Sequence, residues 1–539
     1  MDNFYLCLIK EAKFEKIKNS VDLERFKEKT CKKFRVDMPT NADIRGAYEV
    51  LLKENKIERD AKLESLLKSK NIRTLSGVAV VAVLTKPEKC FGDCLYCPSE
   101  KNMPKSYLSN EPAVMRAISS SFDPYYQVQK RLEALFLNGH DISKIEIIVM
   151  GGTFSHLSKD YRTWFIKECF RGCNKYKLQV KSEKLKVEDD KSYLFSNEKT
   201  ARELFRELER EQKKNEVAGC RVVGLTLETR PDCIDEEEVQ EFLELGATRV
   251  ELGVQSVFDS VLKVNRRGHG VKEIVKATRL LKNAGFKISY HLMPGLLGSN
   301  LKKDLKTFEK VFFDSRFKPD LIKIYPCVVT ENSDLYELYN KNKYAPLSDE
   351  ETKELILKIK KIVPEYVRVS RIIRDIPTSS IVAGPKISNL RQLIEKESIC
   401  RCIRCRESKN EYSKDEPSIL RRKEYKASGG KEIFLEICSS DEKKLFSLLR
   451  LRIFKEKGET KAFIREVHTY GKVAGISKDR NGRKPQHSGM GKKLVQEAEK
   501  IAFEEFGAKK ISVISGVGVR EYYRKLGYRL EKTYMVKEF

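Results

Sequence analysis

Residues 77–98 read GVAVVAVLTKPEKCFGDCLYCP, an apolar run that leads directly into three closely spaced cysteines. The apolar part, Gly77–Leu84, is rich in β-branched residues and typical of a buried strand. Cys90, Cys94 and Cys97 follow with Cx3Cx2C spacing. Three thiolates at this spacing can hold three irons of a four-iron cluster, whereas cluster sites normally use four cysteines, so one iron would lack a protein ligand. A zinc turn or buried free thiols are the alternatives, and zinc would need a fourth ligand.

Strand and helix signals alternate from about residue 74 to residue 370. Strand-like runs lie at 77–84, 145–150, 222–227, 248–254, 287–292 and 320–325, and amphipathic stretches at 113–137, 235–245, 271–284 and 301–313 lie between most of them. Strands joined by crossover helices form parallel sheets. The pattern predicts an α/β fold, a curved and partly open (βα)6 barrel with its chemistry at the carboxyl ends of the strands. The lysine- and glutamate-rich stretch 174–218 predicts an exposed insertion.

Several polar or small residues follow the predicted strands and should face one end of the barrel. Gly151 and Gly152 follow the second strand, where glycines let the backbone approach a ligand closely. In radical S-adenosylmethionine (SAM) enzymes this position contacts SAM, and an open cluster iron binds its amino and carboxylate groups. A plain turn is the alternative. The other residues expected at this end are Glu228, Arg230, Gln255, His291, Lys323 and Tyr325, each of which could also be a structural polar residue.

A second cysteine triplet, CRCIRC, contains Cys400, Cys402 and Cys405 in an irregular basic segment. Such a segment has little core of its own, so a structural zinc ion is the favoured interpretation, with free thiols as the alternative. Closed tetrahedral zinc requires a fourth ligand. Cys327 is the candidate.

The sequence QHSGMG at 486–491 matches the Q/R-x-x-G-x-G/A signature of GCN5-related acetyltransferases. Backbone N–H groups at a helix start can bind the pyrophosphate of coenzyme A, and the helix dipole favours the anion. A predicted strand at 463–476, a helix at 489–505 and a strand at 510–515 give the motif its context. The predicted cofactor-binding residues are Gln486, His487, Gly489, Met490, Gly491 and Lys492, with Tyr522 and Tyr523 on a later helix near the coenzyme sulfur, of which at least one should belong to the core.

The chain has 539 residues, a net charge of +27 and 14 cysteines. A surplus of positive charge favours a polyanionic partner such as nucleic acid. It is concentrated at 263–287 (+7) and 386–426 (+5), although a solvated basic face is the alternative. The longest apolar run is too short to span a bilayer, and the first residues lack a signal-peptide core, so we expect no membrane partner. Clustered cysteines suit a reducing compartment, so we expect a cytoplasmic protein.

Taken together, these motifs resemble the Elongator catalytic subunit family of tRNA-modifying acetyltransferases. The resemblance covers nearly the whole chain from about residue 70. The stretches that carry it are RTLSGVAVVAVLTKP, EPAVMRAI, IVMGGTF, LTLETRPD, LGATRVELGVQS, AGFKISYHLMPGLLGS, RDIPTSSIVAG, CRCIRCRE, REVHTYG, QHSGMGKKLVQEAEKIA and ISVISGVGVREYYRKLGY.

Amphipathic spacing predicts an N-terminal helical extension at 1–73, for which a plain helical extension and a tRNA-binding arm both stay open. The resemblance implies a radical SAM core at 74–370, a zinc-bearing linker at 371–429 and an acetyltransferase domain at 430–539. It implies a [4Fe-4S] cluster on Cys90, Cys94 and Cys97, SAM, acetyl-CoA and zinc. The implied substrate is the wobble uridine in a tRNA anticodon stem-loop, and the implied product is 5-carboxymethyluridine. Accessory subunits or a homo-oligomer stay open.

Lys323, His468 and Tyr523 are the candidate catalytic residues, the last two as groups that could activate the water that hydrolyses the thioester. Two other functions are compatible with the motifs. One is a protein lysine acetyltransferase with a structural iron–sulfur cluster, which a strongly basic chain disfavours because it repels basic peptides. The other is a tRNA-binding scaffold that senses SAM or acetyl-CoA without turnover.

Overall fold

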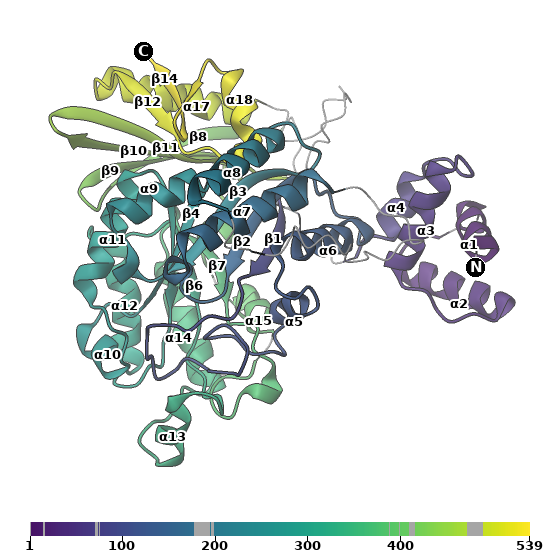
Figure 1. Ribbon diagram of the computed structural model, residues 1–539, viewed down its shortest axis with the longest axis horizontal. Helices are drawn as coiled ribbons and strands as arrows, with labels where there is room; N and C mark the ends of the chain where they lie inside the picture. Colours follow the sequence, from purple (N-terminus) through teal and green to yellow (C-terminus); the bar gives the residue numbers. More distant parts are fainter. Residues whose placement is uncertain are drawn as a thin grey trace.

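The computed structural model describes residues 2–14, 17–69, 74, 76–176, 195, 199–387, 389–397, 399–408, 416–471 and 489–539. Figure 1 shows an N-terminal group of helices beside a large central body, with a second sheet at the C-terminal end. The N-terminal group comprises α1 (Asp2–Phe14), α2 (Ser20–Phe34), α3 (Asn41–Lys53) and α4 (Ala61–Leu66), as the sequence predicts. These helices share their own core, built around Leu8, Leu23, Ile44, Tyr48 and Leu63.

The central body contains, among the described residues, a parallel sheet whose seven strands follow each other in chain order. The strands are β1 (Ala79–Leu84), β2 (Lys144–Met150), β3 (Arg221–Thr229), β4 (Arg249–Gln255), β5 (Lys287–Leu292), β6 (Leu321–Ile324) and β7 (Arg368–Ile372). The six predicted strands are confirmed. The predicted six-stranded barrel lacks one strand that the structure contains. This strand is β7, which pairs with Ile322 to Ile324 of β6 and which the sequence signal did not separate from the linker.

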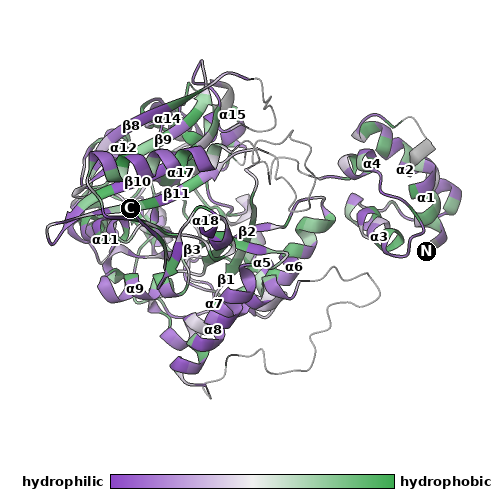
Figure 2. Ribbon diagram, turned by 90° about the horizontal axis from the view of Figure 1, so that it is seen from above, coloured by the Kyte–Doolittle hydropathy of each residue, from purple (hydrophilic) through white to green (hydrophobic). Residues whose placement is uncertain are grey.

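Amphipathic helices cover the outside of this sheet and bury their apolar faces against it. They are α5 (Pro112–Ile118), α6 (Pro124–Leu137), α7 (Lys159–Asn174), α8 (Ala201–Asn215), α9 (Glu236–Glu244), α10 (Asp259–Val264), α11 (Val271–Asn283), α12 (Leu301–Phe313) and α14 (Asp349–Ile362). Figure 2 shows the hydrophilic residues on the outer faces of several of them. Helix α13 (Asp334–Asn340) lies away from the sheet, and its Leu335 packs in an apolar cluster with Cys94 and Cys327. The predicted helix 113–137 is divided because Ser121 and Phe122 have positive φ and Pro124 begins a new helix.

The expectation of an exposed insertion at 174–218 is wrong for its second half. Helix α8 packs on α7, and its Leu204 and Leu208 are buried. The spacing of these leucines places them on one face, which the high charge of the segment obscured. Residues 177–194 lie outside the described part of the chain.

The linker contains α15 (Leu390–Glu397) and α16 (Ile403–Arg406), and the second sheet is mixed, with strand order β13-β14-β12-β11-β10-β9-β8. Its strands are β8 (Ser418–Ala427), β9 (Gly430–Ser439), β10 (Leu445–Glu456), β11 (Glu459–Thr469), β12 (Lys510–Val513), β13 (Arg529–Glu531) and β14 (Tyr534–Glu538). Helix α17 (Met490–Lys500) packs on β10 and β11, and α18 (Arg520–Arg524) follows β12. The sheet begins at Ser418, so the expected boundary at 430 lies too late: β8 pairs with β9 along its full length.

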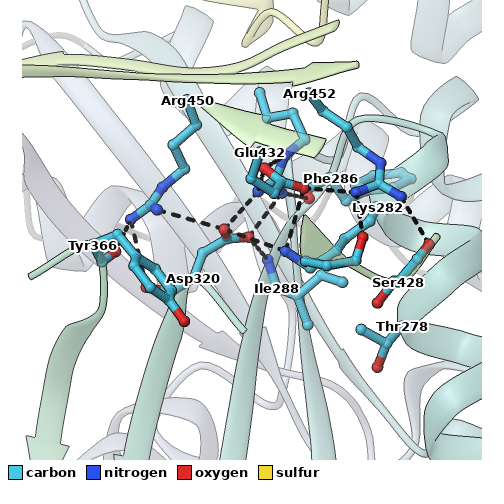
Figure 3. Close-up of polar contacts among 12 residues, drawn as sticks. Thr278, Lys282, Phe286, Ile288, Asp320, Tyr366, Ser428, Glu432, Arg450 and Arg452 are labelled. Carbon is cyan, nitrogen blue, oxygen red and sulfur yellow. Dashed lines mark hydrogen bonds and ion pairs between the residues drawn. The ribbon is translucent and has the colours of Figure 1, made fainter. Parts of the chain in front are cut away.

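A buried ionic network joins the two sheets (Figure 3). Arg465 of β11 lies 2.6 Å from Asp320, just before β6, and 2.7 Å from Glu432 of β9. Arg450 and Arg452 of β10 contact the same two carboxylates. These side chains are at most 1% exposed, so the second sheet is fixed against the amino ends of the barrel strands. Within the described part of the chain, each helix is too short or too polar to span a lipid bilayer.

Candidate active site at the open end of the barrel

A pocket of about 190 Å³ lies at the carboxyl ends of the parallel strands. The loop after β1 contributes Cys90, Cys94 and Cys97, and the loop after β2 contributes Gly152. Every polar residue that the sequence placed at this end of the barrel also lines the pocket: Glu228, Arg230, Gln255, His291, Lys323 and Tyr325. The carboxyl ends of neighbouring parallel strands meet at one edge, which is why positions far apart in sequence come together here.

The three cysteines of the first triplet are free thiols on one short loop. Cys94 is buried, and its Sγ accepts a hydrogen bond of 3.4 Å from Nη1 of Arg267. A hydrogen bond from Cys97, together with the Arg267 charge, lowers the pKa of Cys94 to about 5, whereas the shared proton raises the pKa of Cys97. Cys94 is therefore a thiolate at neutral pH, which is the form that binds iron.

The turn after β2 and the end of β4 have unusual backbone conformations. Gly151 has φ +129°, and a Cβ at this position would overlap Oγ1 of Thr85. Gln255 has φ +66°, and its buried Oε1 has no hydrogen-bond partner among the described residues. A strained backbone and an unsatisfied acceptor beside a pocket both indicate a ligand that completes the site.

A line of polar side chains runs from the pocket into the barrel interior. His291 Nδ1 lies 3.4 Å from Glu228, and its Nε2 lies 2.9 Å from Glu251. Glu251 also pairs with Lys323, and its other oxygen lies 3.6 Å from Arg249. Burial alone would raise the pKa of Glu251, but the Lys323 ammonium and His291 outweigh it and hold the pKa well below its usual value. Burial likewise opposes the charge of Lys323, yet Glu251 raises its pKa, so both groups are ionised.

Sequence reasoning missed three residues that complete this pocket. Tyr107 donates a hydrogen bond of 3.2 Å to Glu228, and the guanidinium of Arg374 lies over the Tyr107 ring. Arg267 approaches the cysteines from the loop after α10. Arg267 belongs to the basic stretch KVNRRGHG, but nothing in that stretch indicated which arginine points inward. Tyr107 gave no sequence signal, and Arg374 begins the stretch RDIPTSSIVAG, which did not indicate that this arginine reaches the pocket.

The sulfur atoms of Cys400, Cys402 and Cys405 lie within 4.8 Å of one another, so the structure brings the second triplet together. Cys402 precedes α16, whose first N–H bonds to Val367 near β7. Hydrogen bonds from Cys400 and Cys405 lower the pKa of Cys402, which leaves a thiolate suited to a metal ion.

The structure corrects the expectation that Cys327 is the fourth ligand of this triplet. Cys327 is 1% exposed in the apolar cluster that also contains Cys94, Leu335 and Tyr344. Its backbone N–H bonds to Pro294 in the loop after β5. Cys327 follows β6 at the pocket end of the barrel, beside Gly384 and apart from the triplet, and within the described residues the metal-competent group has three cysteines.

The predicted coenzyme loop is described in part. Gln486 and His487 lie outside the described residues, whereas Gly489 is the residue before α17 and Met490, Gly491 and Lys492 form its first turn. A Cβ built on Gly491 would lie 3.2 Å from Oη of Tyr522. Tyr522 is 38% exposed, but Tyr523 is 5% exposed in the core of this sheet. Tyr522 is thus the tyrosine beside the loop, and Tyr523 packs behind it in the core.

His468 lies far from the cysteines along the barrel axis, in a second cavity of about 230 Å³. This cavity is lined by the first residues of the barrel strands, among them Val78 and Arg249, and by Glu466 to Tyr470. His468 Nε2 lies 2.9 Å from the carbonyl oxygen of Ser76, so Nε2 carries the proton. Burial lowers the pKa of His468, which keeps its imidazole neutral and leaves Nδ1 as an acceptor.

Two family models match the barrel, the radical SAM superfamily at residues 85–311 and the Radical_SAM C-terminal domain at residues 319–399. The tRNA uridine(34) acetyltransferase of Methanocaldococcus infernus is 42% identical over 98% of each chain. Human Elongator complex protein 3 is 36% identical over 96% of this chain and 93% of that protein. The chain belongs to the family of Elongator complex protein 3.

Within this family, the solved structure of archaeal M. infernus Elp3 lacking residues 1–46 aligns with a TM-score of 0.71 and 40% identity. The alignment covers 86% of this chain and all of that one. The radical SAM half-barrel and the second mixed sheet are thus features of the family. Radical SAM membership implies a [4Fe-4S] cluster and SAM, and the residues present fit both: a buried thiolate at Cys94, two more cysteines on the same loop, and an unsatisfied amide oxygen at Gln255.

Proposed function

We propose that the chain modifies the wobble uridine of tRNA and forms 5-carboxymethyluridine from acetyl-CoA. The observation that carries the proposal is that one chain combines a three-cysteine pocket at the open end of a radical SAM barrel with a glycine-flanked helix start in a second sheet. Relatives named tRNA uridine(34) acetyltransferase, 42% and 45% identical, support the substrate.

In this proposal Cys90, Cys94 and Cys97 hold the cluster, and the Gly151–Gly152 turn and Gln255 receive SAM. When bound, the cluster and SAM supply a carbon radical that removes hydrogen from an unreactive C–H bond. Gln255 presents a buried acceptor, and the turn passes so close to Thr85 that Gly151 can carry no side chain.

The floor of the pocket can recognise a base that has left its stack. Lys323, held as an ammonium by Glu251, can donate a hydrogen bond to the base, and the Glu228 carboxylate can accept one from it. Arg371 and Arg374 line the same pocket and can attract the phosphates of an anticodon loop. The pocket therefore offers both hydrogen-bonding partners that the edge of a uracil requires.

The second sheet, from Ser418 onward, is the proposed acetyltransferase domain. The first turn of α17, from Gly489 to Lys492, would bind the pyrophosphate of coenzyme A. Its backbone N–H groups have no carbonyl acceptor within the helix and are therefore available to the phosphates. Nδ1 of His468 can accept a proton from the water that hydrolyses the thioester. Cys400, Cys402 and Cys405 are the proposed zinc ligands in the linker, and the N-terminal helices are a proposed tRNA-binding extension.

The test is incubation of the reconstituted, reduced protein with SAM, acetyl-CoA and tRNA carrying uridine at position 34, with cytidine-34 tRNA as the control. We expect 5-carboxymethyluridine by nucleoside mass spectrometry, with 5′-deoxyadenosine and free coenzyme A formed in the uridine reaction. Unmodified uridine together with a loaded cluster would reject the proposal. Acetylation of a basic peptide in the absence of SAM would support a lysine acetyltransferase instead.

A further inference from the structure

Arg267 is a buried arginine that contacts a cysteine of the candidate cluster site. It is 6% exposed, and its Nη1 donates to Sγ of Cys94 at 3.4 Å. Its Nη2 donates to the carbonyl oxygen of Gly253 in β4 at 2.6 Å. The fork of the guanidinium thus connects the cysteine loop to the barrel wall through one side chain.

The surrounding residues fix this orientation from two sides. A Cβ on Gly253 would lie 2.6 Å from Nη2 of Arg267, so glycine is needed for the close approach. Arg230 donates through Nη2 to the carbonyl oxygen of Arg267 at 2.7 Å, while its guanidinium lies over the ring of Phe91 in the cysteine loop. Arg230 is held in turn by Asp232, at 2.7 Å. Arg230 and Arg267 together therefore connect the barrel to the cysteine loop.

We propose that Arg267 is a positioning residue that raises the reduction potential of the cluster held by Cys90, Cys94 and Cys97. The inference rests on the proposed function only in its assumption that these cysteines hold a cluster. Hydrogen bonds to the ligand sulfurs, net charge and burial are the features that set such potentials.

The direction of the effect follows from charge. One-electron reduction of the cluster adds one negative charge, makes no bond and breaks none, with the electron supplied by a low-potential external reductant. A guanidinium that cannot lose its proton stabilises this added charge, and it does so strongly because the site is buried away from water. Reduction is therefore easier with Arg267 than without it.

The test compares Arg267→Gln and Arg267→Lys with wild type, and uses Arg266→Gln as the matched control. Arg266 is the neighbouring arginine and also reaches the cysteine loop, but its ion pairs with Asp93 and Asp334 are exposed, at 3.2 and 3.3 Å. Each reconstituted protein is analysed for iron and sulfide, and its midpoint potential is measured by redox titration monitored by electron paramagnetic resonance.

We expect a more negative midpoint potential for Arg267→Gln, a smaller shift for Arg267→Lys, and none for Arg266→Gln. A fully loaded Arg267→Gln protein with the wild-type potential would overturn the inference. If Arg267→Gln binds no cluster, the second neutral variant, Arg267→Met, decides, because an unchanged potential with full loading in that variant also overturns it. The titration uses neither tRNA nor acetyl-CoA, so its result is separate from failure of the proposed tRNA modification.

Discussion

At the scale of single residues, Glu251 determines the charge at the floor of the pocket. It lies inside the barrel, 1% exposed, and contacts Lys323, His291 and Arg249. Barrel interiors are normally filled by apolar side chains. A buried ionic group persists there because each charge has a partner, and removal of one partner leaves the others uncompensated.

Glu251→Gln should therefore lower the free energy of unfolding by about 3 kcal/mol, because Lys323 would remain buried without its carboxylate. Denaturant titration measures the change. Glu237→Gln is the matched control, since Glu237 also pairs with a lysine but is 76% exposed, and we expect no measurable change there. Equal stability of both variants and wild type would show that the barrel charges contribute little.

Lys282 makes a prediction about pH. It is fully buried, 3.7 Å from Asp320 and 3.5 Å from Glu432, and burial lowers its pKa from 10.5 to about 8. At pH 7 both folded and unfolded chains bind this proton, and the folded state carries the full cost of burying the charge. Between pH 8 and 10.5 the unfolded chain binds more protons, so this contribution to stability rises with pH.

Lys282→Met should consequently raise the free energy of unfolding by about 1–3 kcal/mol at pH 7, because arginines still pair with both carboxylates. The gain should shrink as the pH rises above 8, which urea titrations at several pH values would detect. Lys276→Met, at an exposed position of the same helix, is the control. A loss of stability at every pH would mean that the network needs this ammonium.

At the scale of elements, α17 begins where the proposed coenzyme site lies. Gly491 in its first turn faces Tyr522, and a Cβ there would lie 3.2 Å from the phenol oxygen. Gly491→Val should weaken coenzyme A binding at least about tenfold, because the side chain fills the space that the phosphates need. Calorimetric titration with coenzyme A measures this. Gly219→Val, at a site with no neighbour within 4 Å of a Cβ, should bind normally.

The linker triplet is tested by metal removal. Cys402→Ser should abolish zinc binding, because Cys402 supplies the thiolate that the other two cysteines face. Zinc per chain, measured by mass spectrometry after expression with zinc, should fall from about one to near zero. Cys233→Ser keeps the triplet intact and should retain zinc. Full zinc content in Cys402→Ser would place the ion elsewhere.

At the scale of the whole molecule, the buried network fixes the second sheet to the barrel. Arg465 contacts both Asp320 and Glu432 within 2.7 Å, so its contacts join β6, β9 and β11. The second cavity lies between the two sheets, with His468 on one side and the strand starts on the other.

Arg465→Met should lower the free energy of unfolding by about 3–5 kcal/mol, since it leaves two buried carboxylates with fewer partners. Scanning calorimetry should also show the second sheet unfolding before the barrel. Arg529→Met removes an arginine whose side chain is 63% exposed and should preserve the transition. A single unshifted transition for Arg465→Met would show that the network is not what couples the two parts.

Local sequence patterns were enough to predict the strand–helix alternation, the two cysteine triplets and the residues at the ends of the barrel strands, because each depends on short-range periodicity or on the rule that parallel strands end at one edge. The glycine motif before α17 was also recognisable from neighbouring residues alone. Tertiary contacts were needed to show that Arg267 reaches Cys94 and that Cys327 lies with Cys94 rather than with the linker triplet. They also show that Tyr523 belongs to the core while Tyr522 is exposed, and that β7 and β8 extend the two sheets. These contacts join residues far apart in the chain, and long-range packing depends on how whole elements close around one another, which no local pattern records.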